Sequence, residues 1–274
     1  NSGVMRPGKR HLLRLLKEAG YTTGLAGKNH CFPAAEVGWF DHRWDCGHYG
    51  PTGADVEPKY KESMRFLRSS EALHAAWGHV VNPNPPDALG TAWTTDHAVK
   101  FLRENHEKPF FLWYSIPDPH IPFQTSEPYA SMYPPASVEV PPAEPDGMAG
   151  KPRSQQMDHH VMRGDLVDEQ TIREVTGLYY GINAHIDVEL GRFFSEMTRL
   201  NLDGNTIVIY VSDHGEYLGE HRMIRKSKTA YECLIRIPFM VRGPGIEPGR
   251  REAMVTLEDV MPTLLGLLGM EIPV

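Results

Sequence analysis

Residues 206–216 read TIVIYVSDHGE, an apolar run followed at once by a polar cluster. The run 206–211 has the length of a strand, and its continuous apolar character is typical of a strand buried on both faces of a sheet. Asp213 and His214 come directly after it. In open parallel sheets, ligands bind beyond the carboxyl ends of the strands. This stretch therefore predicts a buried strand that delivers a carboxylate and an imidazole to a site.

Two other apolar segments end in the same way. TTGLAG at 22–27 runs into KNH at 28–30, and PFFLWYSI at 109–116 runs into PDPH at 117–120. Helical patterns alternate with these strands, which predicts an α/β fold with a mostly parallel central sheet sandwiched by helices. The further elements expected are a helix at 11–19, a helix over AVKFLREN that follows a polar start at Thr94, Thr95 and Asp96, one or two helices over 169–200, a helix at 257–268 and a strand at PFMVRG, 238–243.

Two segments lack a clear period. Residues 33–86 are rich in Trp, Gly, Pro and His, and residues 124–164 hold many prolines. We expect both to be irregular insertions that shape a pocket, the first of them with a helix near 61–74.

Composition excludes several classes of protein. The 274 residues, 41% of them hydrophobic and 23% charged, suffice for one sizeable core. A net charge of −7 without a long Lys/Arg run argues against nucleic acid or an anionic membrane as a partner. No run of 18 apolar residues predicts a transmembrane helix, and the opening NSGVMRPGKRH has no apolar segment of a signal peptide, so the location stays open. Cys31, Cys46 and Cys233 are expected to be free thiols.

The polar clusters have a possible common chemistry. Asp213 and His214 could form half of a divalent-metal site, although Asp213 could instead cap a turn against which His214 packs. Lys28 and His30 lie two residues apart, so in an extended segment they face the same way and suit a sulfate or phosphate ester. A solvated lysine beside a packed histidine is the alternative. His120 follows two prolines that stiffen its loop.

A further cation follows the DHGE cluster. Lys226 and Lys228 lie in RKSKTAYE, which could be only a solvated turn. Either ammonium could also fold back over the same pocket and neutralise an ester oxygen. We expect Lys226 to do so.

Five ordered segments resemble the sulfatase family of the alkaline-phosphatase superfamily. GYTTGLAGKNH is similar to that family's GYxTxxxGKWH, and KPFFLWYSIPDPHIPF is similar to KPFFLxxSFxxPHxPF. YYGINAHIDVELGRFF and NTIVIYVSDHGEYLGEH resemble its long signature ending in SDHGExLGxH. YECLIRIPFMVRGPG and LEDVMPTLLGLLG continue the match in family order, so that the resemblance covers residues 20–268.

The resemblance implies roles for seven residues. Asp213 and His214 would bind the divalent cation, which is usually calcium in this family. Lys28 and His30 would contact the sulfate and the nucleophile. His120 would assist the leaving group, Lys226 would bridge sulfate and leaving oxygen, and His221 matches a family position near the pocket. Asn29 replaces the family's usual Trp, a departure that could alter the pocket wall.

The resemblance also implies parts that these 274 residues do not hold. Sulfatases use a formylglycine made from Cys or Ser in a C/S-x-P/A-x-R motif, expected well upstream of GKNH. CFPAA at Cys31 fits C-x-P, but Ala35 stands where Arg is required and the motif lies downstream of GKNH. The paired aspartates of the metal site and a small C-terminal subdomain are also expected elsewhere. We therefore expect a partial sulfatase catalytic domain, 1–274, truncated at both ends and inactive alone.

The function expected of the longer parent is hydrolysis of a sulfate ester, carried by a small molecule or a sulfated saccharide. A phosphonate or phosphate ester hydrolase of the same superfamily is the first alternative, because esters of sulfur and phosphorus pose similar electrostatic problems. A non-catalytic sulfatase-like binding fragment is the second. A parent of this kind could be periplasmic or secreted. The substrate and the oligomeric state are left open.

Overall fold

Two of the three segments that the sequence predicts as strands leading into the site, residues 22–27 and 109–116, lie side by side in the central sheet. The computed structural model describes residues 6, 8–53, 56–142 and 147–273. In it, β1 (Thr22–Gly27) pairs in parallel with β2 (His42–Gly47) and with β5 (Phe110–Ser115), and β2 pairs antiparallel with β3 (Gly50–Pro51). The order β3-β2-β1-β5 confirms an α/β fold with a mostly parallel central sheet.

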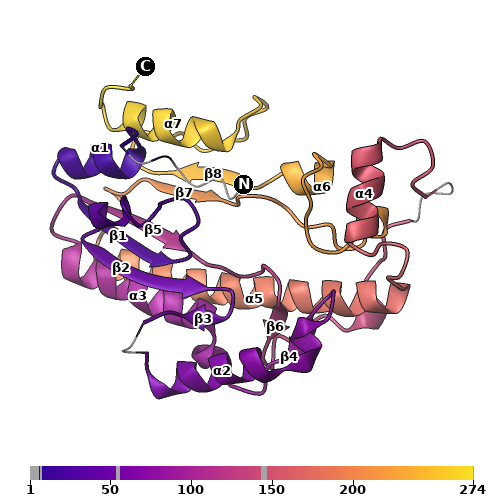
Figure 1. Cartoon of the computed structure of the whole chain (residues 1–274). Helices are drawn as coiled ribbons and strands as arrows, with labels where there is room; N and C mark the ends of the chain where they lie inside the picture. The colour runs from indigo at the N-terminus through magenta and orange to yellow at the C-terminus, as the bar shows by residue number, and fades with distance from the viewer. Residues whose placement is uncertain (1–5, 7, 54–55, 143–146, 274) are drawn as a thin grey trace.

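Helices cover both faces of this sheet (Figure 1). α1 (Leu12–Glu18) packs on β1, and α3 (Gly90–Asn105) packs on the sheet from the other side, with α5 (Glu169–Arg199) lying along α3. The Asp168 carboxylate accepts a hydrogen bond from the Thr171 amide over 2.7 Å and so caps the start of α5. The buried side chains between β1, α3 and α5 are Ala26, Ala98, Val99, Leu102, Phe193 and Met197.

The remaining elements surround this core. The helices are α2 (Pro58–Ser69), α4 (Arg153–Val161), α6 (Glu232–Ile235) and α7 (Val260–Leu267). The strands are β4 (His79–Val81) with β6 (Phe123–Thr125), and β7 (Val208–Val211) with β8 (Phe239–Arg242). Short 3-10 turns are η1 (Val37–Trp39), η2 (Glu71–His74), η3 (Pro86–Ala88), η4 (Pro135–Ser137), η5 (Glu220–Arg222) and η6 (Leu257–Asp259). Within the described ranges, no helix is both long and apolar enough to cross a bilayer.

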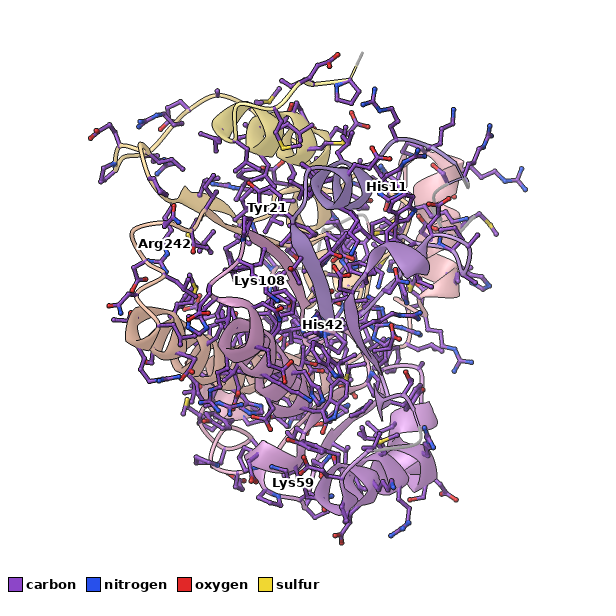
Figure 2. All side chains as sticks on the ribbon, turned by 90° about the vertical axis from the view of Figure 1, so that its left-hand side faces the viewer. His11, Tyr21, His42, Lys59, Lys108 and Arg242 are labelled. Atoms are coloured by element: carbon purple, nitrogen blue, oxygen red, sulfur yellow. The ribbon has the colours of Figure 1, made fainter. Side chains whose placement is uncertain are left out.

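Figure 2 looks at the molecule from the side where the parallel strands begin. Tyr21 and Lys108 lie just before β1 and β5, and His42 opens β2. The carboxyl ends of these strands, and the residues that follow them, therefore lie on the opposite side of the sheet.

The prediction for the start of α3 was wrong. Thr94 and Thr95 were expected to precede the helix, but α3 begins at Gly90 and both side chains are buried inside it. Their hydroxyls donate to the carbonyls of Gly90 and Thr91 over 2.8 and 2.9 Å. Because a threonine hydroxyl can bond to the preceding helical turn, it is tolerated in a buried helix interior.

The strand at 206–211 is shorter and more open than predicted. β7 begins at Val208, and Tyr210 and Val211 are 38% and 36% exposed. Among the described strands β7 pairs only with β8, in a separate antiparallel pair. A strand in a two-stranded pair lacks the neighbours that bury both faces of a central strand.

The first irregular insertion is partly regular. Residues 33–86 were expected to form an irregular region, but they supply β2 of the central sheet, then β3 and α2. The expected helix near 61–74 is present as α2 and the turn η2. Among the described residues of 124–164, the regular elements are the end of β6, η4 and α4.

Candidate active site

Seven side chains meet beyond the carboxyl ends of β1, β2, β5 and β7. We call this group the strand-end cluster. Its members are Lys28, His30, His48, His120, Asp213, His214 and Lys226. Charges within this group influence the pKa values of Lys28, His30, His48, His120 and Lys226 across elements that are distant in sequence. The structure thus brings together six of the seven residues implied by the resemblance and adds His48.

Lys28 is positioned by the close approach of β1 to β5. Gly27 has φ +115°, and a Cβ there would lie 1.8 Å from the carbonyl oxygen of Ser115, so only glycine fits. The Lys28 amide donates to the same carbonyl over 2.8 Å. Burial lowers the pKa of the Lys28 ammonium, and the Asp213 carboxylate opposes this effect.

Asn29 organises the turn between Lys28 and His30. Its Oδ1 accepts hydrogen bonds from the amides of Cys31 and Phe32 over 3.2 and 2.9 Å, and its Nδ2 donates to the Phe32 carbonyl over 3.0 Å. A tryptophan could not make these hydrogen bonds. The asparagine that replaces the family's usual Trp therefore stabilises the turn at residues 29–32. Burial and the positive charge of Lys28 lower the pKa of His30.

His120 is held in one tautomer. Its Nδ1 donates to the Ile121 carbonyl over 2.6 Å, which leaves the lone pair on Nε2. Burial lowers the pKa of His120 to about 4, and the charges of Lys226 and Lys28 act in the same direction. Asp118, on the same loop, is anchored by Thr91, whose hydroxyl donates to the Asp118 carboxylate over 2.5 Å.

Asp213 and His214 fit part of a divalent-cation site. The Nδ1 of His214 donates to the Gly215 carbonyl over 2.7 Å, so Nε2 keeps the lone pair that a metal needs. This Nε2 lies 3.6 Å from Oδ1 of Asp213. Within the described chain, no group of three or more His, Cys, Asp or Glu could hold a metal, so these two residues supply only part of a coordination shell.

Two backbone hydrogen bonds close the loop at residues 217–225 and so place Lys226 in the cluster. The Tyr217 amide donates to the Arg225 carbonyl over 3.1 Å, and the Gly219 amide donates to the Met223 carbonyl over 2.8 Å. Burial lowers the pKa of Lys226, Lys28 adds to this effect, and Asp213 opposes it. Lys228 is exposed. Lys226 therefore lies with the cluster, and its role at the ester stays a prediction.

His48 belongs to the cluster but was missed by sequence analysis. It follows β2, and its ring stacks on His120 with centroids 3.7 Å apart. The rule that polar residues after parallel strands meet at one edge would have found it. It was overlooked because residues 33–86 were expected to be irregular, so that no strand was expected before His48.

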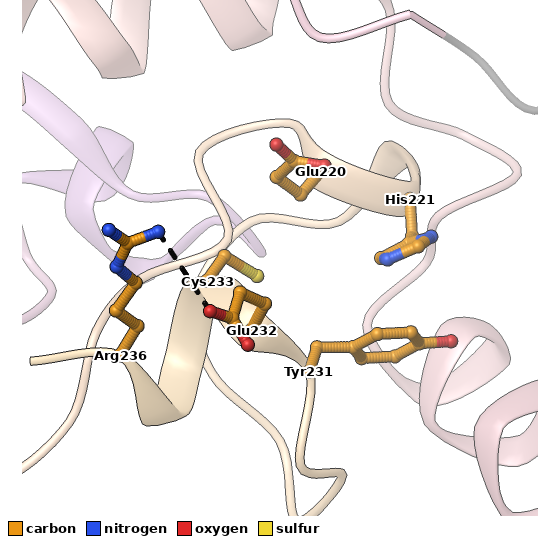
Figure 3. A pocket seen from close by; sticks show the side chains of 6 residues that line it. All are labelled: Glu220, His221, Tyr231, Glu232, Cys233 and Arg236. Atoms are coloured by element: carbon orange, nitrogen blue, oxygen red, sulfur yellow. Dashed lines mark ion pairs between the residues drawn. The ribbon is translucent and has the colours of Figure 1, made fainter. Parts of the chain in front are cut away.

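His221 lies in a cavity of about 340 Å³, drawn in Figure 3. Its ring packs on the ring of Tyr231 with centroids 4.0 Å apart. The cavity is also lined by Glu220, Glu232, Cys233 and Arg236, the last paired with Glu232 over 3.9 Å. His221 is therefore placed among residues of η5 and α6, and its role in substrate binding stays a prediction.

Solved structures share this fold. The phosphonate monoester hydrolase SpPMH from Silicibacter pomeroyi matches with a TM-score of 0.76 at 20% identity, over 100% of this chain and 60% of that one. A protein solved in complex with its substrate D-glucosamine-2-N,6-O-disulfate matches with a TM-score of 0.72 at 20% identity, over 99% of this chain and 63% of the other. The architecture is thus alkaline-phosphatase-like.

Sequence comparison identifies the family. The arylsulfatase of Clostridium perfringens is 30% identical over 93% of this chain and 58% of its own length. The multifunctional alkaline phosphatase superfamily protein PehA of Trinickia caryophylli is 32% identical over 77% of this chain and 45% of its own length. The chain thus spans about half the length of these relatives. The family model described as Sulfatase matches residues 6–270. The chain therefore belongs to the sulfatase family.

Proposed function

We propose that this chain is part of an enzyme that hydrolyses sulfate esters. The observation that carries the proposal is the strand-end cluster. Two half-buried lysines, Lys28 and Lys226, lie within electrostatic reach of each other and of His120. Mutually repelling cations in partly buried positions are unfavourable unless an anion joins them, so the arrangement suits a sulfate group.

The roles follow from the geometry of each side chain. Lys28 and Lys226 bind the sulfate oxygens and neutralise charge that develops as the ester bond breaks. His30 contacts the sulfate and the nucleophile. His120 presents Nε2 and protonates the leaving oxygen; a bound anion offsets the two ammonium charges and so raises the pKa of His120 toward neutral.

Asp213 and His214 hold part of a divalent-cation site, with calcium as the expected ion. When bound, the cation polarises the ester and favours the ionised form of the nucleophile. Oxygen ligands in addition to Asp213 are needed to satisfy calcium, which takes about six to eight. We propose that residues outside this chain supply them.

The nucleophile of the full-length protein is proposed to be a formylglycine outside these 274 residues. Cys31 is the one cysteine near the cluster that has a proline two residues later. Burial and the Asp213 carboxylate raise the pKa of its thiol, so that the unreactive protonated form is favoured. Ala35 also stands where the formylglycine motif requires Arg, so Cys31 is not proposed as the nucleophile.

The substrate class is proposed to be a sulfated small molecule or saccharide. Relatives include an arylsulfatase and the choline-sulfatase of Rhizobium meliloti, and one structural neighbour holds a disulfated glucosamine. Selection among such substrates is proposed to depend on residues 33–86, which include His48, and on residues 124–164. His221 is proposed as a further residue that contacts the substrate. Phosphonate or phosphate ester hydrolysis is the second candidate, because PehA, described as multifunctional, is 32% identical.

The test is a substrate panel on the full-length protein that contains this chain. Aryl esters of sulfate, phosphate and phosphonate with one shared leaving group are compared by kcat/KM. Preference for the sulfate ester supports the proposal, whereas preference for phosphonate or phosphate selects the second candidate. If no ester is hydrolysed although formylglycine is present by mass spectrometry, the enzymatic proposal is wrong and a binding role remains.

A further inference from the structure

His48 stands on a rigid part of the fold. β2 ends at Gly47 and β3 begins at Gly50, and these two residues pair with each other, so His48 and Tyr49 form a two-residue hairpin loop. The hairpin is anchored by the buried Cys46, whose Sγ lies 3.8 Å from the Gly90 carbonyl at the start of α3. A side chain on so short a loop is held more firmly than one on a long insertion.

The His48 ring lies between two other members of the cluster. It stacks on His120 with centroids 3.7 Å apart and ring planes 19° from parallel. It meets His30 edge to face, with centroids 5.6 Å apart and planes 80° apart. His48 thus connects the loop after β1 with the loop after β5 through ring contacts.

Hydrogen bonding does not explain the position of this ring. Nδ1 of His48 is buried and has no hydrogen-bond partner among the described residues. Leaving a buried polar atom unpaired is unfavourable, so the placement of the His48 ring must be favoured by other contacts. The His48 ring instead stacks on the face of the His120 ring. Any role of the His48 side chain is therefore expected to act through this contact.

The electrostatics suit a stacking partner that stays neutral. Burial lowers the pKa of His48 to about 3, and His120 adds to this effect. A neutral aromatic face beside His120 can remain in contact whether His120 is neutral or protonated. A second imidazolium at the same distance would instead repel it.

We propose that His48 is a positioning residue that holds the His120 ring in its working orientation by stacking. The hydrogen bond from Nδ1 to Ile121 sets the tautomer of His120, and the His48 face restricts rotation of the ring about its side-chain bond. The aromatic face is the functional part of His48, and its nitrogens are dispensable. The catalytic consequence rests on the proposed function, whereas the effect on ring order does not.

The first experiment measures ring order in the full-length protein that contains this chain. Carbon-13 relaxation of the His120 ring is compared in the wild type, His48→Ala and His48→Phe. We expect the ring to become mobile in His48→Ala and to stay ordered in His48→Phe, which keeps the face and loses the nitrogens. Equal order in all three proteins would overturn the proposal, and loss in both variants would assign the role to a nitrogen.

The second experiment measures turnover by the full-length protein with sulfate esters of poor leaving groups. Misplacing a catalytic group costs up to about 100-fold, so kcat of His48→Ala should fall roughly 10- to 100-fold with little change in KM. His48→Phe should recover most of this loss. A rise in KM in both variants would instead make His48 a substrate contact. If the wild type hydrolyses no sulfate ester, the proposed function fails, and the relaxation experiment still decides the position of His120.

Discussion

The amide of Tyr217 donates a hydrogen bond to the carbonyl of Arg225 over 3.1 Å, and this bond closes the loop that precedes Lys226. The same tyrosine is buried, and its hydroxyl lies 2.6 Å from Oγ of Ser227 and 2.8 Å from Oγ1 of Thr229. Residues on both sides of Lys226 are therefore hydrogen-bonded to one residue, Tyr217, through its backbone amide on one side and its hydroxyl on the other. This explains how a lysine in a charged, turn-like sequence comes to lie beside Asp213.

Lys226→Ala should lower kcat/KM of the full-length protein for an aryl sulfate by roughly 10²- to 10³-fold, because it removes a fixed charge from the developing oxyanion. Lys228→Ala is the matched control, since Lys228 is exposed two residues away. It should leave kcat/KM nearly unchanged. Similar losses in both variants would show that general positive charge, and not the position of Lys226, is what matters.

His120→Ala should lower turnover by roughly 10²- to 10⁴-fold for esters with poor leaving groups. Activated aryl esters should lose less, because their leaving groups need little proton transfer. Lys28→Ala, which removes charge from the ester oxygens, should affect good and poor leaving groups alike. The measurement is kcat/KM across a leaving-group series. A constant loss for His120→Ala along the series would refute the general-acid role.

Gly27→Ala should destabilise the chain strongly, because its Cβ would lie 1.8 Å from the Ser115 carbonyl oxygen and φ is +115°. Gly20→Ala is the control, with φ +88° and no atom within 4 Å of the added Cβ. It should cost about 1–2 kcal/mol from backbone strain alone. Urea unfolding gives both free energies, or, for Gly27→Ala, the absence of a folded protein. Equal losses would mean that β1 and β5 do not approach as described.

The free energy of unfolding should decrease as pH falls below 6.5. The pKa of His48 is lowered to about 3 and that of His120 to about 4, from an ordinary value of 6.5. The unfolded chain therefore binds more protons than the folded chain below pH 6.5, so this stability is complete above that pH and is lost toward pH 4. Urea unfolding at pH 7 and pH 4.5 measures the loss.

His48→Phe should reduce this pH dependence, because phenylalanine cannot be protonated. The control is His160→Phe, in which an exposed histidine is replaced. That variant should keep the wild-type dependence on pH. If His48→Phe and His160→Phe behave alike, the stacked pair does not titrate as described.

The sequence by itself determined the elements with strong local patterns and the residues that follow them. β1 and β5 appear where apolar runs of strand length predict them, and α1 and α5 follow helical periods. Lys28 and His120 could be placed near one another because the parallel strands β1 and β5 end at a common edge of the sheet, whereas Asp213 follows β7, which among the described strands pairs only with β8. Each of these predictions depends on residues that are close in sequence.

The tertiary structure decided what depends on distant contacts. β2 has little periodicity of its own and becomes a strand by pairing with β1, which is why His48 was missed. The buried threonines of α3 and the open edge of β7 likewise reflect neighbours that a local pattern does not contain. Lys226 reaches the cluster only because a cross-loop hydrogen bond and the buried Tyr217 close its loop. The sequence determines which side chains carry a charge. Which residues contact those side chains is determined by packing between segments that are far apart along the chain.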